Sequence, residues 1–107
     1  MHHKDVVESA AIGIPDDIKG MSLVVFCVLK KDIVPSELLR NDLKQLVIEE
    51  MGKPLAPKEI LFVNDLPKTR NAKVMRRMIR SAYLGQELGD TSSLVNPEAV
   101  EGIRNAV

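Results

Sequence analysis

The sequence predicts an α+β domain, in which a small three-stranded mixed sheet packs with two main helices and a short C-terminal helix. Apolar runs typical of strands occur at residues 6–13, 22–30 and 59–64. Residues 38–47 and 74–83 instead repeat their apolar positions at helical spacing. Because strand and helix segments are mixed rather than strictly alternating, the pattern fits α+β better than a doubly wound sheet.

The composition fits one small domain with a modest aliphatic core. The chain has 107 residues, of which 45% are apolar, with no Trp, one Tyr and two Phe. Its formal net charge is zero, which argues against a general polyanion binder. Because a single cysteine excludes an internal disulfide and no membrane-length apolar run or signal peptide is present, a cytoplasmic location without a membrane partner is expected.

Two strands are expected before the first helix. Residues 6–13 form an apolar run rich in β-branched side chains, and residues 13–17 have the composition of a turn. Residues 22–30 are nearly all apolar, which indicates a strand that is covered on both faces and therefore central in its sheet. Cys27 lies in this run and is expected to pack in the core.

The first helix is expected to start after Ser36, a suitable N-cap, and to end at Gly52 and Pro54. One face collects the apolar residues Leu38, Leu39, Leu43, Leu46 and Val47.

The second helix should end at Gly85, and Asn96 is expected to cap a short C-terminal helix. We expect Tyr83 to pack through its ring and to keep its hydroxyl in water. The apolar stripe of the second helix comprises Val74, Met75, Met78, Ile79, Ala82 and Tyr83.

A basic segment follows the third strand and is the most informative part of the chain. Pro67 ends the strand pattern, and Asn71 has a side chain that can cap a following helix. Lys73 would then lie in the first helical turn, where free N–H groups and the helix dipole favour an anion. The simpler interpretation is a solvated basic helix start. Six cations fall within thirteen positions without an intervening acid: Lys68, Arg70, Lys73, Arg76, Arg77 and Arg80.

The segment Pro-Lys-Thr-Arg-x-x-Lys-x-x-Arg-Arg, residues 67–77, resembles the C-terminal signature of the AMP-forming acyl-CoA synthetases, members of the adenylate-forming superfamily. In that family the pattern ends in a Gly-Lys pair whose lysine is catalytic, so the resemblance assigns this role to Lys73. Ala72 departs from the usual glycine, which reaches backbone angles that alanine avoids. Residues 5–16 and 52–57 also look like family segments. The tail, residues 89–94, is similar to the ending of acetyl- and propionyl-CoA synthetases.

The resemblance implies that residues 1–107 are the mobile C-terminal lid domain of a two-step ligase, with the hinge and the large N-terminal adenylation domain absent. The full enzyme would use ATP, Mg²⁺ and CoA to activate a small carboxylic acid, acetate by the similarity of the tail. Lys73 would bridge the substrate carboxylate and the phosphate. No cofactor and no metal site are expected in this fragment, which should be inactive without the N-terminal domain, supplied in cis or in trans.

The sequence allows several roles for the other basic residues and more than one function for the chain. Lys68, Arg70, Arg76 and Arg77 could contact nucleotide or CoA phosphates, form interdomain ion pairs or simply be solvated. A stand-alone module that binds nucleotide or CoA-like anions, or a partner protein, is the main alternative to an enzyme domain. A nucleic-acid binder is disfavoured because the basic cluster lacks interleaved aromatic residues.

Overall fold

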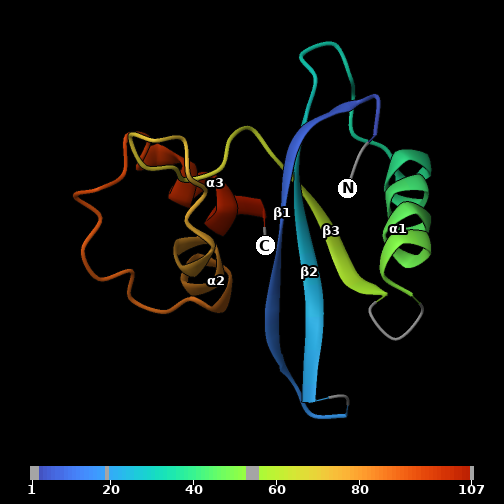
Figure 1. Cartoon of the computed structure of the whole chain (residues 1–107), viewed down its shortest axis with the longest axis horizontal. Helices are drawn as coiled ribbons and strands as arrows, with labels where there is room; N and C mark the ends of the chain where they lie inside the picture. Colours follow the sequence, from blue (N-terminus) through green and yellow to red (C-terminus); the bar gives the residue numbers. More distant parts are fainter. Residues whose placement is uncertain (1–2, 19, 53–55, 107) are drawn as a thin grey trace.

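A computed structural model describes residues 3–18, 20–52 and 56–106 (Figure 1). The strands form one sheet in the order β1-β2-β3, with β1 antiparallel and β3 parallel to β2. This arrangement confirms the predicted α+β class with a mixed three-stranded sheet. In chain order the elements are β1 (Val6–Asp16), β2 (Gly20–Leu29), α1 (Glu37–Met51), β3 (Pro57–Val63), α2 (Arg76–Leu84) and α3 (Glu98–Ala106).

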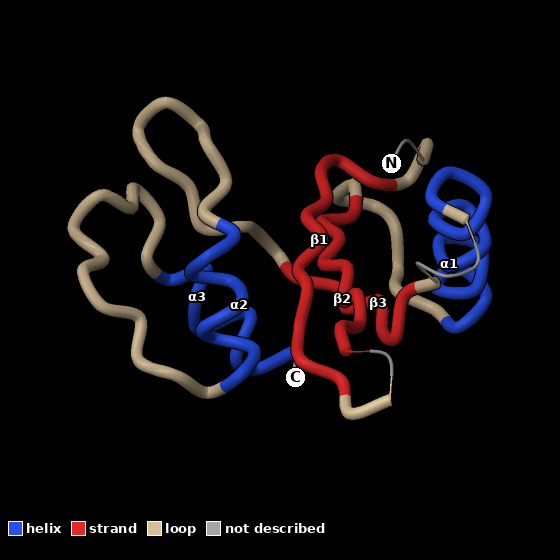
Figure 2. Tube along the Cα trace, turned by 60° about the horizontal axis from the view of Figure 1, so that its bottom comes forward, coloured by secondary structure: helices blue, strands red, loops and turns tan. Residues whose placement is uncertain are grey.

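The sheet lies between two helical layers. α1 covers one face, and α2 and α3 cover the other (Figure 2). Along β2, Val24 and Phe26 join the core under α2 and α3, whereas Val25 and Cys27 join the core under α1. All four side chains are at most 3% exposed. The prediction of a central strand covered on both faces is therefore confirmed.

The first hairpin turns later than the sequence predicted. β1 continues through Ile14 and Pro15 to Asp16, which pairs with Gly20, so the expected turn at 13–17 is wrong. Ile14 is buried in the core under α2 and α3, and this burial keeps the chain extended beyond residue 13. Pro15 is tolerated because β1 is an edge strand, where a missing N–H need not break a ladder.

The first helix has the predicted cap but a narrower buried face. The Ser36 hydroxyl accepts a hydrogen bond from the Leu39 N–H (3.1 Å), and Gly52 follows the last turn. Pro54 lies outside the described residues. Of the predicted apolar face, Leu39, Leu43 and Val47 are buried. Leu38 is 75% exposed, because one residue turns the side chain about 100° around the helix and away from the sheet.

The last two helices pack on the opposite face of the sheet. Gly85 ends α2 in the left-handed conformation (φ 70°), as predicted. Met78, Ile79 and Ala82 are buried along the expected stripe. α3 docks on the body of the domain, since Ala99, Val100 and Ile103 are buried and the last two join the same core. Among the described residues, no helix combines the length and apolar character needed to cross a membrane.

Tyr83 joins α2 to the sheet through both parts of its side chain. Its ring meets Phe26 edge-on, with 6.2 Å between centroids. Its hydroxyl donates a 2.6 Å hydrogen bond to Glu59 on β3, a partner that the sequence did not predict. The sequence alone could not place Glu59 opposite a residue 24 positions later. Burial, and then the neighbouring carboxylate, raise the pKa of Tyr83 to about 12.

We expect Tyr83 to ionise at about 12 rather than near its ordinary value of about 10. The sole Tyr in a chain without Trp gives an unambiguous near-ultraviolet tyrosinate signal. Because the raised pKa belongs to the folded state, the free energy of unfolding should fall as pH rises from the ordinary value towards the folded one. The Glu59→Gln variant should lower the midpoint, and Glu49→Gln, an exposed change on α1, should not. Identical midpoints in Glu59→Gln and the parent would contradict this coupling.

Candidate functional site

The basic segment forms a hairpin-like loop, residues 67–75, here called the lysine loop. Lys68 and Val74 pair as an antiparallel bridge at its base. The Met75 N–H donates to the Pro67 carbonyl (2.9 Å), and the Thr69 N–H donates to the Lys73 carbonyl (3.0 Å). The loop therefore has two hydrogen-bonded arms, and residues 70–72 lie at its tip.

Ala72 adopts the backbone conformation that glycine would adopt more easily. Its φ is +62°, and it is the sole non-glycine residue with positive φ in the described part of the chain. The Ala72 N–H donates to the Thr69 carbonyl (2.9 Å), which closes the tip. The left-handed region costs an L-residue with a Cβ atom about 1–2 kcal/mol. Ala72, which stands where the family usually has glycine, thus lies where the chain turns into the second arm of the loop.

The predicted helix start is wrong. α2 begins at Arg76, after Met75, and no side chain caps it. Asn71 lies at the loop tip, and Lys73 lies three residues before the helix, because the N–H groups around it serve the hairpin and Ala72 is left-handed. Arg76 and Arg77 occupy the first turn with no acid among them, the opposite of the charge preferred by a helix dipole.

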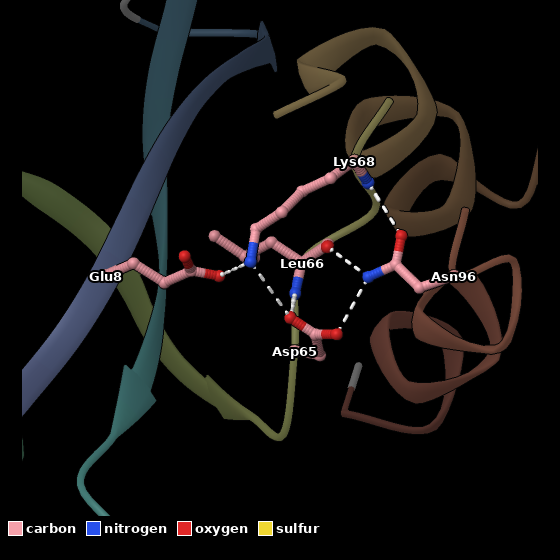
Figure 3. Close-up of polar contacts among 5 residues, drawn as sticks. All are labelled: Glu8, Asp65, Leu66, Lys68 and Asn96. Carbon is pink, nitrogen blue, oxygen red and sulfur yellow. Dashed lines mark hydrogen bonds and ion pairs between the residues drawn. The ribbon is translucent and has the colours of Figure 1, made fainter. Parts of the chain in front are cut away.

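The base of the loop is joined to the body by a polar cluster (Figure 3). The Lys68 ammonium forms ion pairs with Glu8 on β1 (2.7 Å) and with Asp65 (3.2 Å). The Asn96 amide donates to Asp65 Oδ2 (2.8 Å) and to the Leu66 carbonyl (2.7 Å). Its oxygen accepts from the Lys68 N–H (2.8 Å). The predicted capping role of the Asn96 side chain is therefore wrong, because its oxygen is already engaged by Lys68.

The charges of this cluster stabilise one another. The hydrogen bond with Glu8 raises the pKa of Lys68, burial opposes the change, and Asp65 adds to the increase. Burial alone would raise the pKa of Asp65, but hydrogen bonds from Asn96, from the Leu66 N–H and from Lys68 outweigh it and lower the pKa. Both groups are therefore charged at neutral pH, with Lys68 held at the base of the loop.

The other basic residues lie in different surroundings. Lys73 is exposed, and within the described residues its ammonium has no hydrogen bond or ion pair. Arg70 is exposed at the loop tip, in the wall of a hollow shared with residues 92–95 of the tail. Arg76 lines a separate hollow between the sheet and the end of α1. Arg77 faces the 89–90 turn. The predicted site residues are thus dispersed around the loop rather than gathered in one pocket.

Three residues of this cluster were missed by sequence analysis as contributors to the site: Glu8, Asp65 and Asn96. Asp65 carries a usable signal, since an acid directly after a strand and three residues before a lysine can fold back onto it. Asn96 carries an ambiguous one, because Asn before Pro is also typical of a helix start. Its actual contacts are with residues about thirty positions earlier in the chain.

A model of the AMP-binding enzyme C-terminal domain family matches residues 1–73. The chain belongs to this family. An acetyl-coenzyme A synthetase of Methanothrix soehngenii is 46% identical over 98% of the chain, and a 3-hydroxypropionyl-coenzyme A synthetase of Sulfurisphaera tokodaii is 41% identical over 98%. The crystal structure of an acyl-CoA synthetase from Brucella canis superposes on 78% of the chain with a TM-score of 0.72 and 29% identity.

These comparisons confirm the family resemblance seen in the lysine motif. The chain covers 16% of the length of both synthetases and 15% of the Brucella canis chain. It therefore corresponds to one small domain of such proteins. The family model extends to Lys73 and does not include α2, the tail or α3.

We expect Ala72→Gly to raise the free energy of unfolding by up to about 1 kcal/mol. Relief of the left-handed strain, about 1–2 kcal/mol, exceeds the extra chain entropy of glycine, about 0.5–1 kcal/mol. Ala72→Val should lower stability, because a β-branched residue is a genuine outlier at positive φ. Urea denaturation monitored by circular dichroism measures both changes.

The matched control for this comparison is Ala11→Gly, at an exposed position of β1. There the strand conformation suits alanine, so glycine should cost about 0.5–1 kcal/mol. A loss of stability in Ala72→Gly as large as that in Ala11→Gly would contradict the assigned left-handed conformation.

Proposed function

We propose that this chain is the C-terminal lid domain of an AMP-forming acyl-CoA synthetase that activates acetate or another short-chain acid. In the first half-reaction, a substrate carboxylate oxygen bonds to the α-phosphorus of ATP, and the bond from that phosphorus to the pyrophosphate oxygen breaks. In the second, the CoA sulfur bonds to the acyl carbon, the thiol proton is lost and AMP leaves. The names of the relatives, acetyl- and 3-hydroxypropionyl-coenzyme A synthetase, support a small acid.

Lys73 is the residue to which we assign the chemistry of the first step. The observation that carries this assignment is its exposed ammonium on a loop whose two arms are hydrogen-bonded to each other. The carboxylate and the phosphate are both anions, so a fixed cation between them offsets their repulsion and stabilises the developing charge. Lysine suits this position because its charge is compact and its stem is long.

No general base is needed in this scheme, because a carboxylate is already ionised near neutral pH. A Mg²⁺ ion that accompanies ATP would neutralise phosphate charge. Residues 3–18, 20–52 and 56–106 contain no group of three His, Cys, Asp or Glu placed to hold a metal. We therefore assign the metal ligands to the adenylation domain, which would meet this chain in cis or in trans.

The arginines around the loop are proposed contacts for phosphates of the nucleotide or of CoA. Arg70 at the tip and Arg76 and Arg77 at the start of α2 are exposed, so a docked domain could reach them. Lys68 differs from them, since a phosphate would have to displace Glu8 or Asp65 from its ammonium. In a lid that rotates between the two half-reactions, such exposed cations can serve different anions in turn.

The test is pyrophosphate exchange with acetate and ATP in the parent synthetase, with Lys73 or with Lys73→Ala. We expect exchange to fall about a hundred- to a thousandfold, as when one preorganised stabilising group is removed. Thioester formation from preformed acetyl-adenylate should persist, because that step does not need the lysine between carboxylate and phosphate.

Lys58→Ala, an exposed lysine change on β3, is the control and should leave both half-reactions unchanged. Undiminished exchange in Lys73→Ala would contradict the proposal and favour a domain that binds nucleotide or CoA-like anions, or a partner protein, without catalysis.

A further inference from the structure

We propose that Asn96 is a positioning residue: its buried amide holds the lysine loop in the conformation that presents Lys73, so the C-terminal tail takes part in adenylation. This inference rests on the proposed function of Lys73. Asn96 lies outside the part of the chain matched by the family model, residues 1–73.

The Asn96 amide uses both of its polar atoms on the first arm of the loop and the segment leading into it. Its oxygen accepts from the Lys68 N–H (2.8 Å), and its nitrogen donates to the Leu66 carbonyl (2.7 Å) and to Asp65 Oδ2 (2.8 Å). Only 8% of Asn96 is exposed, and Leu66 is fully buried. Removing the amide would therefore leave the Leu66 carbonyl and the Lys68 N–H without their partner in a place poorly reached by water.

Main-chain bonds extend the same contact. The Val95 N–H donates to the Lys68 carbonyl (3.0 Å), and Leu94 pairs with Thr69 as an antiparallel bridge. The Leu94 side chain is buried in the core under α2 and α3, which anchors the tail. The first arm is consequently held between two neighbours, with the tail, residues 94–96, on one side and the second arm on the other.

The position of Lys73 depends on that first arm. Its carbonyl accepts from the Thr69 N–H (3.0 Å), one residue beyond the atoms held by Asn96. Since no described residue forms a hydrogen bond or an ion pair with the Lys73 ammonium, the position of this side chain is set through the backbone of the loop. Reacting groups must be held within about half an ångström for efficient catalysis, so a loosened first arm should impair the step that uses Lys73.

A loss of structure that is confined to the lysine loop should be distinguishable from destabilisation of the whole domain. The two cores are apolar and contain no atom of the Asn96 side chain. Loss of the amide should therefore loosen the backbone of Lys68 and Thr69, while the buried Leu66 side chain and the strands keep their packing. We expect a selective defect in adenylation rather than an equal defect in both half-reactions.

The first experiment compares Asn96→Ala with Asn105→Ala in the parent synthetase. Asn105 is an exposed residue of α3 and provides a matched control in the same tail. In Asn96→Ala, pyrophosphate exchange should fall about ten- to a hundredfold, the scale expected for a misplaced catalytic group, with thioester formation from acetyl-adenylate unchanged. Hydrogen exchange should speed up at the Lys68 and Thr69 amides and stay slow along β2. Asn105→Ala should match the parent in each measurement.

A second set of variants tests the pairing with Asp65. Asn96→Asp keeps an oxygen for the Lys68 N–H but sets a carboxylate against Asp65, so it should lower exchange further than Asn96→Ala. Adding Asp65→Asn restores one donor and one acceptor between the two side chains. In the double variant the Leu66 carbonyl still lacks its donor, so this variant should recover only part of the loss seen in Asn96→Asp. Asp65→Asn alone completes the cycle.

The outcomes separate the inference from the proposed function. If Lys73→Ala abolishes exchange while Asn96→Ala leaves it unchanged, the positioning inference is overturned and the function stands. Equal losses in both half-reactions with faster hydrogen exchange along β2, or no recovery in the double variant, would also overturn it. If Lys73→Ala has no effect on pyrophosphate exchange, the proposed function fails. Separately, unchanged hydrogen-exchange rates at the Lys68 and Thr69 amides in Asn96→Ala would show that the tail does not hold the loop.

Discussion

Burial of β2 on both faces is the constraint on which the rest of the structure depends. Its side chains alternate between two hydrophobic cores, so helices must cover both faces of the sheet. α1 satisfies one face, while α2 and α3 satisfy the second. The lysine loop is the connection that carries the chain from the edge of the sheet to α2, and its base is fixed because both of its ends enter packed structure.

Two lysines five residues apart in the loop have different surroundings. The half-buried Lys68 ammonium forms ion pairs with Glu8 on β1 and with Asp65, which follows β3. Lys73 lies in the second arm next to the tip, and it is exposed. The same residue type thus serves as an anchor at the base and as a free cation near the tip, and sequence spacing alone cannot tell the two roles apart.

Features set by local chemistry were predictable from the sequence, and features set by distant contacts were not. The central strand, the Ser36 cap and the Gly85 helix end follow from short patterns, and the structure confirms them. The motif around Lys73 identified the family. The start of α2 was misplaced because the N–H groups of the loop bond within a hairpin rather than to an Asn71 cap. The role of Asn96 depends on residues 65–68, and no local pattern specifies that pairing.

The two hydrophobic cores share no side chain, and the sheet backbone is what separates them. The sheet consequently lies between α1 and the lysine loop (Figure 2). An exposed position on α1, such as Gln45, offers an attachment point for a fluorophore that would leave the chemistry untouched. With a second dye on the adenylation domain proposed as its partner, energy transfer between the two labels would report the separation of the two domains.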